Sequence, residues 1–77
     1  MGKQLRSARH GALMRELAGA RRAAGMTQRE LARRLKRAHS FVGKIEGGER
    51  QLNVLEFCDY AETLGCDPAD LLRRVLK

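Results

Sequence analysis

The sequence predicts an all-α domain of five short helices. Apolar residues recur at helical spacing over most of the 77 residues, and no long segment alternates with a period of two. Capping signals mark three helix starts, and glycines follow three helix ends. A chain of this length can bury only about 60% of its surface, so it forms one domain with a modest core. We expect residues 1–8 to be a flexible basic arm and residues 9–77 to be that domain.

The first predicted helix ends at Ala24, because Gly25 can adopt the left-handed conformation that stops a helix. Its inward stripe is expected to consist of Leu13, Leu17, Ala20 and Ala24. The other face of this helix carries charged residues and is expected to face solvent.

The second, fourth and fifth helices are each predicted to start at a capping residue. Residues 27–30 (TQRE) and 53–56 (NVLE) match the capping box, in which two side chains satisfy free backbone amides reciprocally. Residues 67–70 (DPAD) repeat the pattern, with proline at the first helical position. Hydrophobic staples are expected to pair Met26 with Leu31, Leu52 with Phe57, and Cys66 with Leu71.

A helix-turn-helix is predicted between residues 27 and 46, with a tight turn at residues 36–38. Small Ala32 allows the two helices to approach closely, and Val42 and Ile45 are expected to lock them together. The pair Gly47-Gly48 closes the second of these helices.

The last two predicted helices differ in the width of their apolar faces. The fourth helix is expected to place five residues inward, namely Val54, Phe57, Cys58, Ala61 and Leu64. The fifth helix carries Leu71, Leu72, Val75 and Leu76, a band wider than contact with one core requires. The excess apolar surface favours a contact with a second chain.

The charge of the chain predicts a polyanionic partner. Sixteen Lys and Arg against nine Asp and Glu give a net charge of +7 and a pI near 10.5. Residues 1–50 carry +9, and residues 51–77 carry −2. With 4% aromatic residues and no Trp, an RNA-stacking platform is disfavoured. The sequence also lacks a signal peptide and a long apolar run, so we expect a cytoplasmic protein with no membrane partner.

The sequence predicts neither an enzyme nor a metal or cofactor site. Cys58 and Cys66 have no histidine near them in sequence, and we expect both to be small core residues. The adjacent His39 and Ser40 cannot face each other on a helix, and no carboxylate is placed to orient the imidazole. Residues 47–49 lack the lysine of a phosphate-binding glycine motif.

Three segments carry a resemblance to a known family: residues 24–32 (AGMTQRELA), 40–50 (SFVGKIEGGER) and 64–72 (LGCDPADLL). In this order and spacing they resemble the Cro and phage-repressor type of helix-turn-helix regulators, also called the xenobiotic-response-element family. The resemblance covers about residues 10–77. It implies a five-helix, lambda-repressor-like DNA-binding domain whose helix-turn-helix is formed by the second and third helices.

Two positions depart from the family pattern. Lys36 stands in the turn where glycine is usual, so either the lysine adopts a strained left-handed conformation or the turn is built differently, at a cost of about 1 kcal/mol. Gly43 stands in a helix where serine is common. Either the glycine allows the helix to approach the DNA backbone closely, or the substitution is neutral.

The resemblance also implies which residues contact double-stranded DNA, since the start of the second helix of the motif enters the major groove. The implied base contacts are Ala38, His39, Ser40 and Lys44. The implied contacts to phosphates or sugars are Gln28, Arg37, Phe41, Gly43 and Arg50. For Phe41, packing between helices is an equal alternative. Arg21 and Glu46 are expected to form a structural salt bridge.

We therefore expect a small homodimeric transcriptional regulator, a repressor that reads a palindromic operator. The dimer interface is expected at Leu72, Val75 and Leu76, with no small-molecule effector. The setting is a bacterial or phage cytoplasm, in association with the nucleoid. Two alternatives stay open: an antitoxin or controller protein of a two-gene cassette that also binds a protein, and an RNA-binding or general protein-interaction module.

Overall fold

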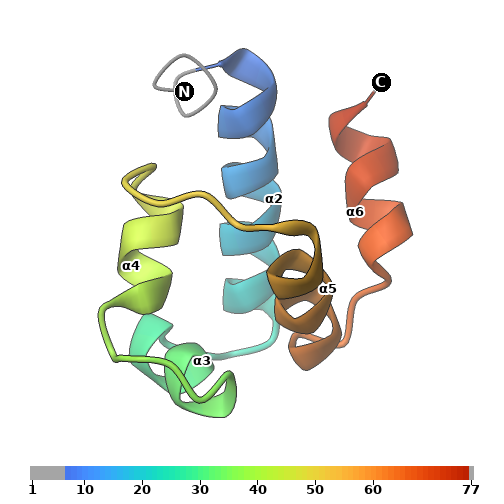
Figure 1. Ribbon diagram of the computed structural model, residues 1–77. Coiled ribbons are helices and arrows are strands. Elements are labelled where there is room, and N and C mark those ends of the chain that lie inside the picture. Colours follow the sequence, from blue (N-terminus) through green and yellow to red (C-terminus); the bar gives the residue numbers. More distant parts are fainter. Residues whose placement is uncertain (1–6, 77) are drawn as a thin grey trace.

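Residues 7–76, described in a computed structural model, contain five helices and no strand (Figure 1). The helices are α2 (Ala8–Ala23), α3 (Gln28–Arg34), α4 (Phe41–Glu46), α5 (Val54–Thr63) and α6 (Pro68–Val75). The prediction of an all-α, five-helix fold is confirmed.

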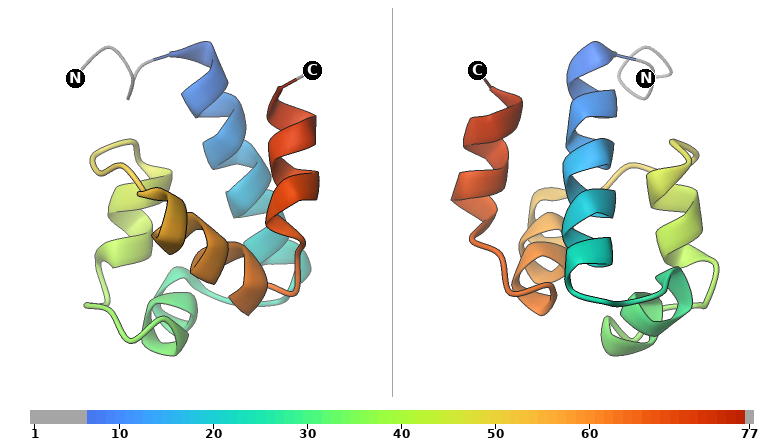
Figure 2. Two further views of the ribbon diagram at one scale, coloured as in Figure 1. Left: turned by 45° about the vertical axis from the view of Figure 1, so that its right-hand side comes forward. Right: turned by 180° about the vertical axis from the view of Figure 1, so that it is seen from behind.

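Helix α2 is central to the arrangement. It packs against α6 on one side and against α4 on the other, while α3 contacts α4 and α5 contacts α6 (Figures 1 and 2). All five helices contribute to one core, which consists of Met14, Leu17, Leu31, Ala32, Phe41, Val42, Ile45, Phe57, Tyr60, Ala61, Leu64 and Leu71. The core fixes the position of the short α4, which would not be stable as an isolated helix.

The helix starts follow the capping signals, with one exception. Asn53 and Glu56 form a complete capping box, and Asp67 accepts a hydrogen bond from the backbone N–H of Ala69 at 2.9 Å. At α3, Thr27 accepts from the backbone of Glu30, but the return bond of the predicted box is not made. Instead, the Glu30 carboxylate pairs with guanidinium groups of its own helix, among them Arg34 at 3.2 Å.

Helix α2 begins earlier than the sequence predicted. Ser7 is its N-cap and accepts a hydrogen bond from the backbone N–H of His10, so residues 7 and 8 of the expected arm belong to the helix start. Residues 1–6, the rest of that arm, lie outside the described residues.

The turn between α3 and α4 contains the unusual backbone conformation expected at Lys36. Its φ is 59°, and among the described residues no other non-glycine residue has a positive φ. The lysine therefore occupies a left-handed conformation that glycine adopts without a steric penalty.

Two predicted inward faces were partly wrong. In α2 the buried residues are Met14, Leu17, Ala18 and Arg21, whereas Ala24 of the predicted stripe is exposed and Leu13 and Ala20 are half-buried. In α5, Val54 is 76% exposed because it is the first helical residue and precedes the turns that pack. Tyr60 of the same helix is fully buried in the core, although its burial was not predicted.

Candidate nucleic-acid interface

The start of α4 presents a run of exposed residues. Every residue from 36 to 40 is exposed, and Lys44 is exposed one turn further along the helix. The opposite face of α4 is buried through Phe41, Val42 and Ile45, so the exposed positions point away from the core. This arrangement brings the four predicted base-contacting residues together: Ala38, His39, Ser40 and Lys44.

The polar side chains on this face have no partner in the described part of the chain. No hydrogen bond or ion pair joins the side chain of His39, Ser40 or Lys44 to another residue of 7–76, and Ser40 makes no side-chain cap. Their donors and acceptors are thus available to a ligand.

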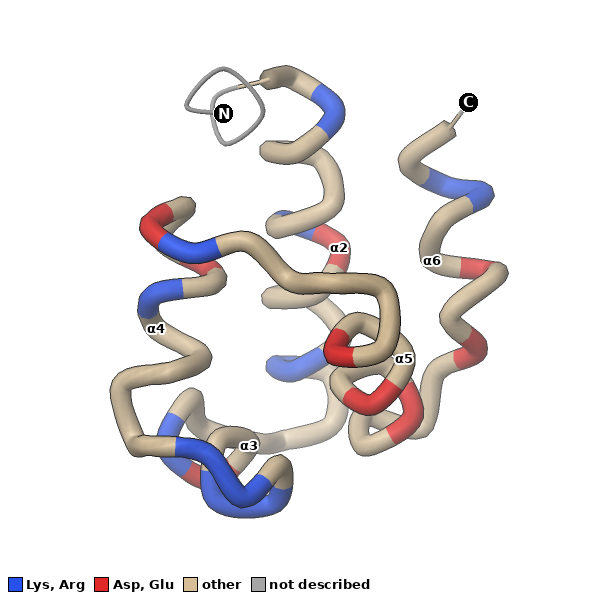
Figure 3. Tube along the Cα trace, in the orientation of Figure 1, with Lys and Arg blue, Asp and Glu red and all other residues tan. Residues whose placement is uncertain are grey.

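Cationic residues surround this face. Helix α3 and the following turn carry exposed cations at Arg29, Arg33, Arg34, Lys36 and Arg37. An open depression is lined by Arg29, Glu30, Arg33, Arg37 and His39, adjoining the start of α4. Figure 3 shows the blue segments along α3 and its turn, and the red acidic segments on α5. The resulting field attracts a polyanion to the surface formed by α3 and α4.

Arg21 and Glu46 form a buried ion pair that connects α2 to the end of α4. The Arg21 Nε lies 2.7 Å from Glu46 Oε2, and a second guanidinium nitrogen lies 3.1 Å from Oε1. Arg21 also donates to the carbonyl of Met26 at 2.8 Å. The hydrogen bonds with Glu46 raise the pKa of Arg21 above its usual value. The pair therefore anchors the orientation of α4 against α2.

Gln28 and Gly43, two predicted DNA-backbone contacts, lie next to each other. Gln28 Nε2 donates to Glu46 Oε1 at 2.8 Å, so the ion-pair network extends into α3. A Cβ atom added at Gly43 would lie 3.3 Å from the Gln28 side-chain oxygen. The glycine thus leaves room for the Gln28 side chain, which gives the departure from serine a structural reason within the chain.

Phe41 is a core residue, which is one of the two roles expected of it. Only 8% of the residue is exposed, because its ring packs with the other core residues of α2–α5. Two guanidinium groups cover what remains accessible: the Cζ of Arg37 is 4.6 Å from the ring centroid, and that of Arg50 is 4.9 Å away. Of the two interpretations of Phe41, the structure favours packing, reinforced by cation–π contacts.

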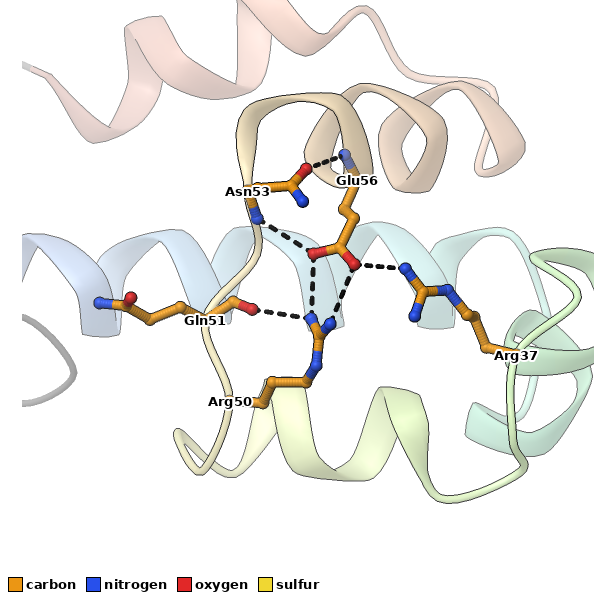
Figure 4. Close-up of polar contacts among 5 residues, drawn as sticks. All are labelled: Arg37, Arg50, Gln51, Asn53 and Glu56. Carbon is orange, nitrogen blue, oxygen red and sulfur yellow. Dashed lines mark hydrogen bonds and ion pairs between the residues drawn. The ribbon is translucent and has the colours of Figure 1, made fainter.

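Arg37 and Arg50 converge on a single carboxylate, that of Glu56 (Figure 4). Arg50 donates from Nη1 to Oε1 at 2.9 Å and from Nη2 to Oε2 at 3.0 Å, and Arg37 donates from Nη2 to Oε2. The backbone N–H of Asn53 donates to Oε1 at 3.1 Å. These donors, Arg50 foremost, lower the pKa of Glu56 to about 2.

The sequence did not predict this role of Glu56. Its position in the NVLE capping box was recognised, but a capping box describes contacts within one helical turn only. Arg37 is 19 positions away from Glu56, so their contact depends on how α5 packs beside α4.

The predicted dimer surface is a partly open apolar groove. Leu72 is 39% exposed and Leu76 is 55% exposed, while Leu71 of the same helix is in the core. The groove between α6, α2 and the start of α5 is lined mainly by apolar residues, including Leu13, Leu52, Val54, Phe57, Leu72, Val75 and Leu76. Val54, wrongly predicted as inward, extends this surface.

Three further features of residues 7–76 concern metal binding, cysteine pairing and membrane crossing. Within that range, no three His, Cys, Asp or Glu side chains are grouped as a metal site would require. Cys58 and Cys66 are free thiols and are half-buried, less than the core position expected of them. None of the helices described is long and apolar enough for a membrane crossing.

Comparisons with known proteins agree with this geometry. A family model described as a helix-turn-helix domain matches residues 1–74. Among solved structures, the chain is similar to an XRE-family like protein from Pseudomonas syringae pv. tomato str. DC3000, with 49% sequence identity and a TM-score of 0.86. That match covers 95% of this chain and 89% of the other. No curated protein matches the sequence significantly.

Proposed function

We propose that this chain, which belongs to the Cro and XRE type of helix-turn-helix regulators, reads a specific duplex sequence through α4. Membership of this family makes it a DNA-binding regulator. The supporting observation is the exposed run from residue 38 to 40, continued by Lys44: the side chains of His39, Ser40 and Lys44 have no partner within residues 7–76. The start of α4 enters the major groove, where Lys44 and Ser40 can bond base edges and Ala38 can pack on a thymine methyl. His39 donates to a guanine acceptor or a phosphate.

The phosphates beside this groove are contacted by residues that flank α4. Gln28 donates only one of its two amide N–H groups to Glu46, so the other is available to a phosphate oxygen. Arg37 and Arg50 are each partly exposed beside α4, and Gly43 allows the backbone to approach closely. These contacts fix the position of α4 on DNA without selecting a sequence.

The protein acts as a homodimer on a palindromic operator and represses transcription by occupying it. Within residues 7–76, one copy carries a single helix-turn-helix, α3 and α4, whereas equivalent major-groove positions recur one turn, roughly 34 Å, apart. One copy therefore reads one half-site, and a second copy is needed for the other. The groove at Leu72, Val75 and Leu76 is the surface through which the copies pair.

Selection from a pool of random duplex DNA by the purified protein tests this function. We expect a two-fold symmetric consensus with half-sites one helical turn apart. Binding that depends on salt but not on sequence would contradict specific recognition and favour a general nucleic-acid-binding module. Co-purification with a second polypeptide would instead favour the two-gene cassette.

A further inference from the structure

We propose that Glu56 is a positioning residue for DNA binding, which holds Arg37 and Arg50 on the two sides of α4 so that their free N–H groups meet backbone phosphates. This inference rests on the proposed DNA binding of α4. Glu56 acts through the two arginines and does not itself contact DNA.

The placement of the three residues in the fold supports this role. Arg37 lies in the turn before α4, Arg50 lies in the loop after it, and Glu56 lies in the first turn of α5 (Figure 4). One carboxylate therefore connects both flanks of the helix that we propose to read DNA. Both guanidinium groups also lie within 5 Å of the ring centroid of Phe41, the first residue of α4.

The relative exposure of the side chains indicates which of them a phosphate can reach. The Glu56 side chain is 13% exposed, whereas those of Arg37 and Arg50 are 41% and 38% exposed. The carboxylate is therefore covered mostly by the groups it binds, and the guanidinium groups form the accessible surface. A phosphate can approach the arginines without displacing Glu56.

The two arginines retain donors after binding Glu56. A guanidinium has five N–H groups. Arg37 uses one nitrogen, Nη2, toward Glu56, and Arg50 uses Nη1 and Nη2 toward Glu56 and the carbonyl of Gln51. The Nε–H groups of both and Nη1 of Arg37 have no partner in the described part of the chain. Two cations sharing one anion leave a net positive charge for the phosphates.

The loss of the Glu56 carboxylate could change DNA affinity in two opposite directions, through charge or through the positioning of the arginines. Removing a negative charge beside DNA should, by charge alone, strengthen binding. However, the Glu56 charge is already neutralised by direct contact with two cations, so its repulsion of a phosphate is small. Without it, the two guanidinium groups repel each other and must be ordered during binding, which weakens the complex.

The test compares Glu56→Gln with Glu49→Gln in equilibrium binding to one duplex at several salt concentrations. Both variants lose one negative charge, but Glu49 is exposed and makes no ion pair within residues 7–76, so it serves as the matched control. We expect Glu56→Gln to bind at least about fivefold more weakly, with a shallower dependence on salt. Glu49→Gln should bind as tightly as the unaltered protein or more tightly.

Binding by Glu56→Gln that equals or exceeds that of Glu49→Gln, with an undiminished salt dependence, would overturn the proposal while leaving DNA binding intact. If the unaltered protein binds no duplex at all, the proposed function itself fails. Circular dichroism establishes that each variant is folded at the assay temperature.

If Glu56→Gln does not fold, NMR of the unaltered protein tests whether Glu56 orders the two arginines. Arginine Nε–H relaxation reports side-chain motion on the picosecond to nanosecond scale. We expect Arg37 and Arg50 to be more ordered than the exposed Arg15 before DNA is added, and to remain so in the complex. Equal mobility of all three in the free protein would overturn the positioning role.

Discussion

His39, Ser40 and Lys44 differ from the charged residues that hold α4 in place. They have no side-chain partner within residues 7–76, whereas Arg21 and Glu46 are bound to each other and largely buried. Removing one partner of a well-buried ion pair costs about 3–5 kcal/mol because the other charge is left uncompensated. The proposed base-contacting residues are thus separate from the ion pair that holds α4 in place, which allows their effects to be measured separately.

Lys44→Ala is expected to relax the preference at one base pair in each half-site, at a cost of about 1–3 kcal/mol for the preferred base. Its side chain has no partner to lose within the described chain, so stability should change little. Competition binding with single-base variants of the selected operator measures this effect. Arg37→Ala is the comparison, and it should weaken all duplexes alike. Uniform weakening by both would mean that α4 does not read the bases.

At the level of residues, the sequence predicted locally determined features better than tertiary ones. A left-handed Lys36 was one of two alternatives that followed from its place in the turn of the family pattern, and it is the one observed. Phe41 remained undecided because its burial depends on how Arg37 and Arg50 cover the ring. The pairing of Arg21 with Glu46 was available only through the family resemblance, since 25 positions separate them.

The helix-turn-helix is held together mainly by its surroundings. Helices α3 and α4 have seven and six residues, which is too short for stability in isolation. Their orientation depends on the buried residues they contribute to the core and on the bonds from Gln28 and Arg21 to Glu46. In the turn between them, Lys36 is the single non-glycine residue of 7–76 with a positive φ.

Lys36→Gly is expected to stabilise the protein by about 0.5–1 kcal/mol, because glycine adopts the left-handed conformation without the steric penalty of lysine. The melting temperature should rise by a few degrees in thermal unfolding followed by circular dichroism. Arg15→Gly is the matched control, since it also replaces an exposed cation by glycine but lies inside α2. It should destabilise by about 0.5–1 kcal/mol. A loss of stability in Lys36→Gly would show that the packing of the aliphatic part of the lysine side chain stabilises the fold by more than the left-handed conformation destabilises it.

At the level of helices, the sequence predicted where elements begin and end but not always which face is buried. Caps and glycines act within a few residues, and α5 and α6 begin directly after their predicted caps. The buried face of α2 was partly misplaced: Met14 and Ala18 are buried, whereas Leu13, Ala20 and Ala24 of the predicted stripe are half-buried or exposed. Tyr60 was missed because a tyrosine hydroxyl usually requires a partner, and this one has none in residues 7–76.

The whole molecule separates a basic half from an acidic one. Residues 1–50 carry +9, and residues 51–77 carry −2. Arg29, Arg33 and Arg37 line one depression with His39, and the groove beside α6 is lined by other residues. Figure 3 shows the blue segments gathered on α3 and its turn. The proposed DNA-binding surface and the proposed dimer surface therefore do not overlap.

Leu76→Glu is expected to convert the proposed dimer to a monomer, raising its dissociation constant by more than about tenfold because a charge would be buried in an apolar contact. Sedimentation velocity across a range of concentrations measures the change. Leu55→Glu is the control, because Leu55 is 76% exposed but does not line the groove. An unchanged dimer in Leu76→Glu, or its loss in Leu55→Glu, would place the interface elsewhere.

The unpartnered side chains at the start of α4 also bear on how such a protein can diversify. Because His39, Ser40 and Lys44 are tied to nothing else within residues 7–76, many combinations of side chains are compatible there with the same scaffold. A lineage could acquire a new operator by exchanging these few residues while its stability stayed constant. The same property makes the chain a suitable host for a library in which only these positions vary.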